Sequence, residues 1–204
     1  MYNLKLEKDG VARGTIQRTY VGYGALEARK AINSFSTEKE YFDSKKKKSG
    51  DVEITEELLT NLNDLSKPLV ESYNVAFPMF DDLNASHLLF EPFFSPERRA
   101  NPFKSNDRLY PVDFATPIDE TLVLNLEYPE NFTITDLPEK IAVSLPNSGG
   151  RYIYELQNLG NKLTLNSSLV IIRTIYSSQE YHYLKELFNR VVSAQEVQVV
   201  FEKK

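Results

Sequence analysis

The sequence predicts a mainly β protein with an antiparallel, β-sandwich-like fold, built from two packed β subdomains with one or two helices. Apolar and polar residues alternate over several short stretches, as they do on half-buried strands. Turn-forming Gly, Asn, Asp and Pro residues separate these stretches, and strands outweigh helices in the pattern. The 204 residues are enough for two small domains with a real core. We expect these subdomains at residues 1–80 and 81–204.

The first subdomain is expected to open with a β-hairpin. Tyr2, Leu4 and Leu6 alternate with polar residues, Asp9-Gly10 is typical of a hairpin turn, and residues 15–21 return with β-branched side chains.

A helix is predicted next, after Gly22-Tyr23-Gly24 interrupts the strand pattern. Residues 25–35 place apolar side chains at helical spacing, and the helix can run on to Phe42. The run of four lysines, residues 45–48, suits a helix C-terminus, with Gly50 as its stop. Four lysines without interleaved aromatic residues are more often a solvated segment than a binding site, so we interpret them that way.

In the rest of the first subdomain, one segment fits both a strand and a helix. Residues 51–65 fit a strand at Val52 and Ile54 but a helix at Leu58, Leu62 and Leu65, and the spacing leaves both open. Residues 63–68 are turn-like. Residues 69–77 then predict a strand, and one of its faces carries Leu69, Glu71, Tyr73, Val75 and Phe77.

A long, edge-running connection is expected between Pro78 and Pro117, and the boundary between the two halves is expected within it, before Tyr110. This stretch holds most of the prolines and the acids Asp81 and Asp82. It also holds an aromatic group in which some rings are expected to be exposed: Phe90, Phe93, Phe94 and Phe103.

The second subdomain is predicted to be a β-meander with a capping helix. Strands are expected at residues 122–128, 141–145, 152–156 and 163–165, continuing at 169–176. Ser177 and Glu180 form a capping box at the start of the helix. The apolar stripe of this helix consists of Leu184, Leu187, Phe188, Val191 and Val192, and alternation at residues 197–201 predicts a closing strand.

Composition excludes several classes of function. A net charge of -5 with interspersed lysines and acids argues against nucleic acid as a partner. No apolar run approaches the roughly 20 residues of a membrane span, and the first residues lack a secretory signal, so a signal for export would lie outside this sequence. The absence of cysteine excludes disulfides, thiolate metal sites and cysteine nucleophiles.

No catalytic, metal-binding or cofactor-binding residues are predicted. His87 and His182 are the only histidines, and neither has the second ligand or orienting partner that a base or metal site needs. Gly22-Tyr23-Gly24 and Gly149-Gly150 lack the context of a phosphate loop. The rival hypothesis of an enzyme would have to use the carboxylates Asp81, Asp82, Asp119 and Glu120, and it requires two acids with strongly perturbed pKa values in one pocket.

Several stretches together carry a family resemblance over nearly the whole chain. They are Asp9-Gly10, Gly14, Gly22-Tyr23, Ala25, Arg29, Asn101-Pro102-Phe103, Arg108-Leu109-Tyr110-Pro111-Val112-Asp113-Phe114, Glu120, Leu137-Pro138, Leu145-Pro146, Tyr152 to Tyr154, Glu180-Tyr181 and Leu184-Lys185. In these stretches the sequence resembles the region C-terminal to the catalytic core in secreted transglutaminase-like proteins of Bacteroidetes. Among the shared residues, Arg108 and Asp113 are candidates for an ion pair.

The resemblance implies a non-catalytic accessory domain of a cell-envelope protein, periplasmic or extracellular. Its role would be to support or position a transglutaminase-like, cysteine-protease-related core that lies upstream in the same polypeptide, and the absence of a cysteine nucleophile here agrees with that. The alternative is an independent cell-surface module that binds glycan or peptide, which an exposed aromatic patch would favour.

Overall fold

The computed structural model describes residues 1–93 and 100–204, so Phe94 of the predicted aromatic group lies outside the described residues. Strands hold 42 % of the chain and helices 22 %, which confirms the predicted mainly β, sandwich-like class. The chain divides into two compact units. Unit 1 is Met1–Ala85 with Asn125–Pro129, and unit 2 is Ser86–Leu124 with Glu130–Lys204.

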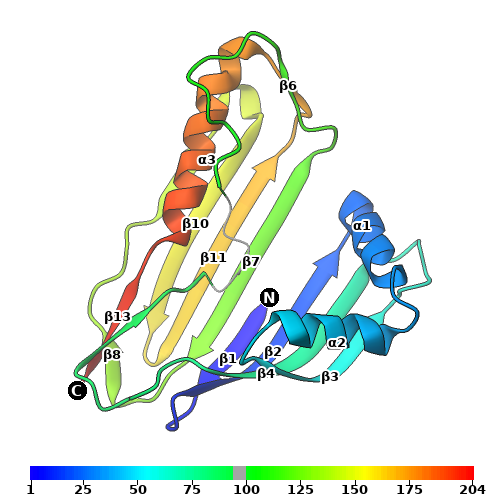
Figure 1. Cartoon of the computed structure of the whole chain (residues 1–204). Coiled ribbons are helices and arrows are strands. Elements are labelled where there is room, and N and C mark those ends of the chain that lie inside the picture. Colours follow the sequence, from blue (N-terminus) through cyan, green and yellow to red (C-terminus); the bar gives the residue numbers. More distant parts are fainter. Residues whose placement is uncertain (94–99) are drawn as a thin grey trace. The chain divides into compact units, whose positions relative to one another are not determined.

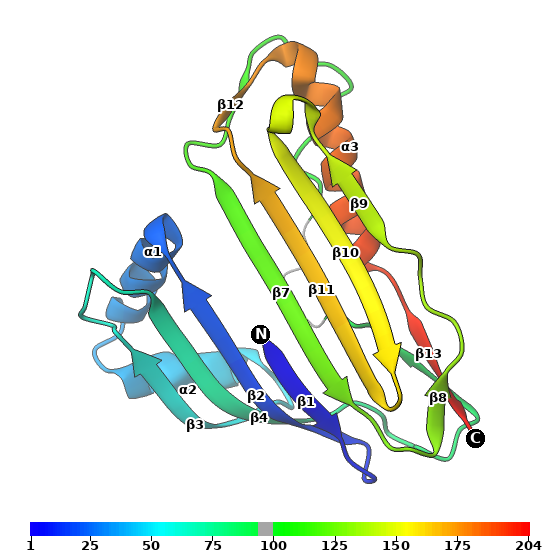
Figure 2. The ribbon, with the colours of Figure 1, turned by 180° about the vertical axis from the view of Figure 1, so that it is seen from behind.

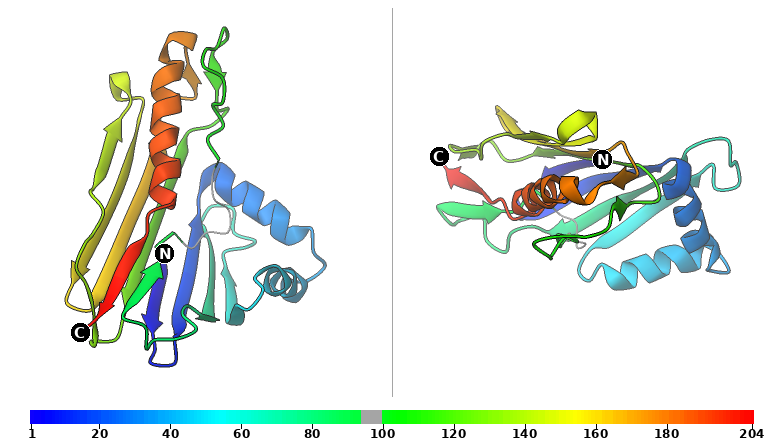
Figure 3. Two further views of the ribbon diagram at one scale, coloured as in Figure 1. Left: turned by 60° about the vertical axis from the view of Figure 1, so that its left-hand side comes forward. Right: turned by 90° about the horizontal axis from the view of Figure 1, so that it is seen from above.

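Unit 1 is a four-stranded antiparallel sheet with two helices on one face (Figures 1 and 3). The strand order is β3-β4-β2-β1. In chain order its elements are β1 (Tyr2–Leu6), β2 (Val11–Tyr20), α1 (Gly22–Asn33), α2 (Glu38–Lys48), β3 (Glu53–Thr60) and β4 (Leu69–Pro78).

The hairpin of β1 and β2 forms as predicted, and its turn depends on Gly10. The residue has a φ of +82°, and a Cβ there would lie 2.2 Å from the carbonyl oxygen of Phe80. Asp9 accepts a hydrogen bond from the Val11 amide (3.1 Å) and forms an ion pair with Arg13 (2.8 Å). The glycine and the Asp9 side chain therefore fix the register in which Tyr2 faces Ile16.

The expectation of one helix running on to Phe42 is wrong, because two helices with separate caps form. The helix α1 ends at Asn33, and the amide of Ser34 bonds back to Lys30 (3.1 Å). Thr37 then caps α2 by accepting from the Glu40 amide (3.1 Å), while the Glu40 carboxylate accepts from the Ser36 amide (3.0 Å). Thr37 and Glu40 have capping-box spacing, so this second helix start was visible in the sequence.

The ambiguous segment at residues 51–65 forms a strand. In β3 the alternation is broken by a bulge between Thr55 and Leu58, where Glu56 has a φ of +52°. Of the three leucines at helical spacing, only Leu58 lies in this strand, and Leu62 and Leu65 lie in the turn that follows it.

Unit 2 consists of a larger sheet, two small sheets and one long helix (Figures 1 and 2). The larger sheet has the order β7-β11-β10-β9, the second β5-β13-β8 and the third β12-β6. The elements are β5 (His87–Phe90), β6 (Val112–Asp113), β7 (Ile118–Glu127, whose end groups with unit 1), β8 (Phe132–Ile134), β9 (Ile141–Ser144), β10 (Gly150–Leu159), β11 (Lys162–Ile171), β12 (Ile175–Tyr176), α3 (Tyr181–Gln195) and β13 (Val199–Lys203), with 3-10 turns at Pro146–Ser148 and Ser178–Glu180.

Three details of the predicted meander need correction. The strand β7 pairs with β11 rather than with β9, the strand predicted to follow it, so the meander of this sheet consists of β9, β10 and β11. Residues 169–176 do not form one strand, because β11 ends at Ile171 and β12 pairs with β6. The predicted connection at 78–117 contains β5 and β6, which were too short to give an alternation signal.

The core of unit 2 lies between the larger sheet and α3. The predicted capping box of Ser177 and Glu180 is present, and α3 lies along one face of the sheet (Figure 3). The predicted apolar stripe is buried at Leu184, Leu187, Phe188 and Val191. No helix in the described residues is long and apolar enough to cross a membrane.

Candidate functional site

The two histidines lie on different elements and share no partner. His87, at the start of β5, has Nδ1 3.0 Å from the Ser86 hydroxyl and Nε2 3.9 Å from a Glu202 carboxylate oxygen. His182, on α3, lies against the ring of Tyr183. Both histidines are exposed.

The carboxylates of the enzyme hypothesis do not form a pair. Asp82 accepts from the Asn84 amide in a turn (2.7 Å), while Asp119 and Glu120 are exposed neighbours on β7. Adjacent strand residues point to opposite faces of a sheet. In the described part of the chain, no three His, Cys, Asp or Glu side chains could hold a metal ion together.

Within the described residues, the aromatic group between Phe90 and Phe103 does not form an exposed platform. Phe90 and Phe103 are buried and Phe93 is half-buried. Phe103 packs edge-on against Phe114, Tyr181 and Phe188, with ring centroids 5.2–6.1 Å apart. The ring of Phe103 therefore belongs to the core of unit 2.

Polar contacts hold the same connecting segment against α3. The Asn101 amide donates to the carbonyl of Lys185 (3.0 Å) and to the Asn189 side chain (2.7 Å), and its oxygen accepts from the Phe103 amide (2.8 Å). The Tyr181 hydroxyl donates to the Ser105 carbonyl (2.9 Å). These contacts give Asn101 and Phe103, two residues of the family resemblance, a structural role.

A buried carboxylate, Glu71 on β4, organises a polar cluster in unit 1. Its side chain is 0 % exposed, and it accepts from the hydroxyls of Tyr41 (3.0 Å) and Tyr20 (3.4 Å). The ammonium of Lys45, on α2, forms an ion pair with it and keeps 17 % side-chain exposure. An ionised carboxylate away from water requires such partners. The cluster therefore ties α2 to the sheet.

Aromatic rings surround the Lys45 ammonium. Its nitrogen lies 5.0 Å from the ring centroids of Tyr41 and Tyr73 and 5.9 Å from that of Phe42, within the range of cation–π attraction. Burial lowers the pKa of Lys45, and the charge of Glu71 opposes that shift. Burial also raises the pKa of Tyr20 and Tyr41 and that of Tyr73 to about 12.

Arg18 extends this cluster from β2. It stands directly opposite Glu71 in the strand register, on the face that carries Tyr20 and Tyr73. Sequence reasoning placed Glu71 on the same strand face as Leu69 and Tyr73 but missed the cluster. The available signal was a charged residue standing between Leu69 and Tyr73 on an otherwise apolar and aromatic face.

Two of the four lysines at residues 45–48 have a structural role. Besides the Lys45 pair, Lys46 forms an ion pair with Glu57 on β3. Lys47 and Lys48 are exposed, in agreement with their interpretation as a solvated helix end.

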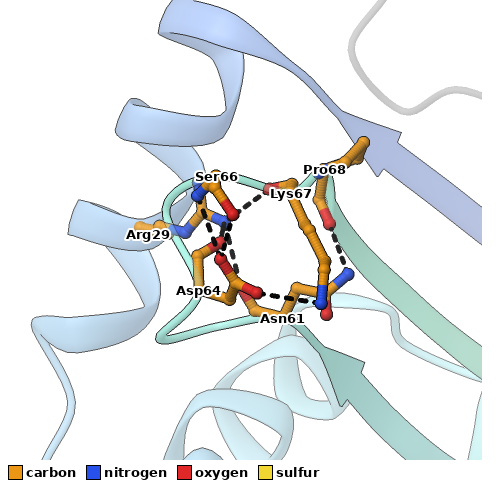
Figure 4. Close-up of polar contacts among 6 residues, drawn as sticks. All are labelled: Arg29, Asn61, Asp64, Ser66, Lys67 and Pro68. Carbon is orange, nitrogen blue, oxygen red and sulfur yellow. Dashed lines mark hydrogen bonds and ion pairs between the residues drawn. The ribbon is translucent and has the colours of Figure 1, made fainter.

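Arg29, on α1, holds the turn between β3 and β4 through backbone carbonyls (Figure 4). It is buried, and its guanidinium donates to the carbonyls of Leu62, Asn61, Asp64 and Lys67 at 2.9–3.0 Å. Burial and the bonds from Nε and Nη2 to four backbone carbonyls give Arg29 a structural role.

One end of unit 2 exposes several large apolar side chains. The segments around β6 and β12 carry them, and we call them the end surface: Leu109 (89 % exposed), Tyr110 (77 %), Ile172 (52 %) and Ile175 (58 %). Ile175 pairs with Asp113 across the two strands, and the Phe114 amide donates to the Thr174 carbonyl (2.8 Å). These hydrogen bonds hold the two segments side by side.

Arg173 makes contacts that hold the β12 segment of the end surface in place. Its guanidinium carbon lies 4.5 Å from the ring centroid of Tyr176, and the side chain forms an ion pair with Glu180 (2.5 Å). The Tyr176 hydroxyl donates to the Gly149 carbonyl (2.6 Å). The candidate ion pair between Arg108 and Asp113 does not form: Arg108 donates to the Tyr110 carbonyl (3.2 Å), and Asp113 accepts from the Ala115 amide (2.7 Å).

Comparison with known proteins gives one match. A family model described as Domain of Unknown Function with solved-structure structure (DUF3858) matches residues 86–201, more than half of the chain. This range begins where unit 2 begins, so it includes the end surface, whereas the Glu71 cluster lies before it. No curated protein and no solved structure matches the chain.

Proposed function

The chain belongs to the DUF3858 family, and from this premise we propose that it is a non-catalytic accessory domain that packs on a transglutaminase-like catalytic core of a cell-envelope protein. The partner is the one that the sequence resemblance implies. The accessory domain would position that core through contact and would contribute no reacting group.

The arrangement of polar side chains supports a role without chemistry. The buried charged groups have structural partners: Glu71 bonds to Lys45 and two tyrosines, and Arg29 bonds to four carbonyls. A catalytic acid or base needs both a perturbed pKa and access to substrate. The acids and histidines of the enzyme hypothesis are dispersed, which favours the accessory domain over that rival.

The observation that carries the proposal is the end surface. Large apolar side chains exposed on neighbouring segments are typical of protein contact sites, and tyrosine is enriched at such sites. Leu109 and Tyr110 are largely exposed, although Val112, two residues after Tyr110, is buried. Because β6 and β12 are hydrogen-bonded to each other, docking there requires little ordering of the backbone.

A functional assay tests the proposal. The rate and thermal stability of the transglutaminase-like segment of the parent polypeptide are measured alone and with this chain added. We expect a saturable change in rate or an increase in stability, which is reduced for the double variant Leu109→Ser/Tyr110→Ser. The matched control is Leu159→Ser, a similarly exposed leucine that ends β10, at the opposite end of unit 2 (Figure 2).

Two results would refute the accessory role. One is an unchanged rate and stability with both pieces folded. The other is a parent polypeptide that contains no transglutaminase-like segment.

A further inference from the structure

The strand β9 lies at an edge of the larger sheet of unit 2 (Figure 2). Among the described strands it pairs only with β10. An edge strand presents backbone N–H and C=O groups that can pair with another strand, unless its sequence prevents this. The register of β9 against β10 determines which of these groups are free.

The backbone groups of Ala142 and Ser144 point away from β10. The Leu145 amide donates to the Gly150 carbonyl (2.8 Å), which lies opposite it one step beyond the last pair of the register. Bonded and non-bonded pairs alternate in an antiparallel ladder, so Val143 also bonds to β10, whereas Ala142 and Ser144 do not. No described residue bonds to their free N–H and C=O groups, and both residues are exposed.

The edge of β9 lacks the features that usually protect an edge strand. Its four residues, Ile141–Ser144, carry no charge and pair with β10 without a bulge. The strand β3, at an edge of the sheet of unit 1, differs in both respects. A bulge follows Thr55, and Glu53 and Glu56 add negative charge. Bulges and charged side chains hinder pairing with a further strand, so β3 is protected and β9 is open.

A second copy of β9 fits this edge. When two copies run antiparallel with Val143 opposite Val143, Ala142 of each copy lies opposite Ser144 of the other. Every free N–H and C=O group of these two residues then has a partner, because the bonded pairs fall on the residues that point outward. The half-buried Val143 side chains meet at the twofold axis, and β-branched residues pack well across paired strands.

Charge is compatible with this pairing. Lys140, the charged residue directly before β9, would lie opposite Pro146 rather than opposite a second lysine. Its ammonium is also paired with Glu155 on β10 (3.2 Å). Like charges therefore do not oppose each other across the two strands, which would otherwise disfavour the pair.

We propose that this chain forms a homodimer in which β9 pairs antiparallel with β9 of a second copy, about a twofold axis at Val143. The pairing joins the larger sheets of two copies of unit 2 into one sheet. Because the shared edge is only four residues long, the dimer is weak, with a dissociation constant on the order of 0.1 mM. The interface uses no residue of the end surface, so it does not depend on the proposed accessory role.

Two measurements on the whole chain test the dimer. Sedimentation equilibrium between about 10 µM and 1 mM should show a monomer–dimer equilibrium. Hydrogen exchange at the same concentrations reports on the edge itself. The amides of Ala142 and Ser144 should become protected as the concentration rises, whereas the Val143 amide, already bonded to β10, should keep its protection.

Two variants of one residue separate backbone pairing from other causes of association. Ala142→Pro removes an N–H that β10 does not use, and it should weaken the dimer about tenfold or more. Ala142→Thr is the matched control, because it keeps the N–H and places a strand-favouring side chain at an exposed position. It should dimerise like the parent chain, within about threefold.

A chain that remains monomeric up to about 1 mM would overturn the proposal. So would a dimer that Ala142→Pro leaves intact, or one that Ala142→Thr weakens as much as Ala142→Pro does. If Ala142→Pro fails to fold, exchange in the parent chain decides. Exchange of the Ala142 and Ser144 amides that does not depend on concentration then overturns the dimer.

Discussion

Glu71 of β4 and Lys45 of α2 form an ion pair in which the carboxylate is fully buried and the ammonium reaches solvent only in part. The pair matters for α2, because Phe42 is the only fully buried residue of that helix. Polar contacts therefore contribute an unusual share of what holds α2 to the sheet. A buried ion pair is costly to break, because the remaining charge is left without a partner.

Replacing Glu71 with Gln is predicted to destabilise the chain by roughly 3 kcal/mol, because Lys45 would lose its counter-charge among aromatic rings. The measurement is urea unfolding followed by circular dichroism. Glu57→Gln is the matched control, since it breaks the more exposed Lys46 pair and should cost about 0–1 kcal/mol. Equal losses in the two variants would contradict the structural role assigned to Glu71.

Stability is predicted to fall at alkaline pH because of the tyrosines around Glu71. Burial raises the pKa of Tyr73 from 10.0 to about 12, so the unfolded chain releases its proton first. Stability from this group is complete below pH 10 and is lost as the pH rises towards 12. Lys45, whose pKa burial lowers from 10.5, acts in the opposite direction, because its unfolded form holds a proton that the folded form has released.

The measurement for this prediction is the free energy of unfolding as a function of pH, together with tyrosinate absorbance. Tyr73→Phe should flatten the loss between pH 10 and 12. The account fails if the variant and the parent chain lose stability in parallel over that range.

Arg29→Lys is predicted to destabilise the chain by about 2–3 kcal/mol, because a lysine ammonium cannot reach all four carbonyls that the guanidinium binds. Lys30→Gln, which affects an exposed pair with Glu27 on the same helix, serves as the control and should cost less than about 1 kcal/mol. Thermal unfolding distinguishes the two variants. A loss below 1 kcal/mol for Arg29→Lys would show that the turn folds without the arginine.

Tyr152 and Tyr154, two residues apart on β10, should respond oppositely to loss of their hydroxyls. The buried Tyr154 hydroxyl has no hydrogen-bond partner among the described residues, so Tyr154→Phe should leave stability unchanged or raise it by up to about 1 kcal/mol. The Tyr152 hydroxyl contacts that of Ser167 (3.2 Å), so Tyr152→Phe should cost about 1 kcal/mol. Chemical denaturation of both variants measures the difference, and the reverse order would refute this assignment.

The strands with clear alternation could be predicted from the sequence. The β1–β2 hairpin, β4, β10 and the capped helix α3 form where the pattern placed them, because each buries one face and is bounded by turn residues. The prediction of one helix running on to Phe42 was wrong for a local reason. Thr37 and Glu40 carry the signal of a helix cap, and this signal competes with the continuing apolar periodicity.

Pairing between strands was harder to predict than the strands themselves. The position of β7 beside β11 is set by the burial of side chains distant in sequence, and β5, β6 and β8 are too short for alternation to be recognised. Glu71 was placed correctly on its strand face, but Arg18, Tyr41 and Lys45 come from separate elements. Their convergence depends on tertiary packing, to which a single sequence gives no direct access.

The most direct test of the proposed accessory role is the affinity, measured by calorimetry, between this chain and the transglutaminase-like core that we propose for its parent polypeptide. The account predicts saturable one-to-one binding that Leu109→Ser/Tyr110→Ser weakens at least tenfold, through the loss of two anchoring side chains, and that Leu159→Ser leaves unchanged. Absence of binding between folded partners, or equal weakening by Leu159→Ser, would contradict it.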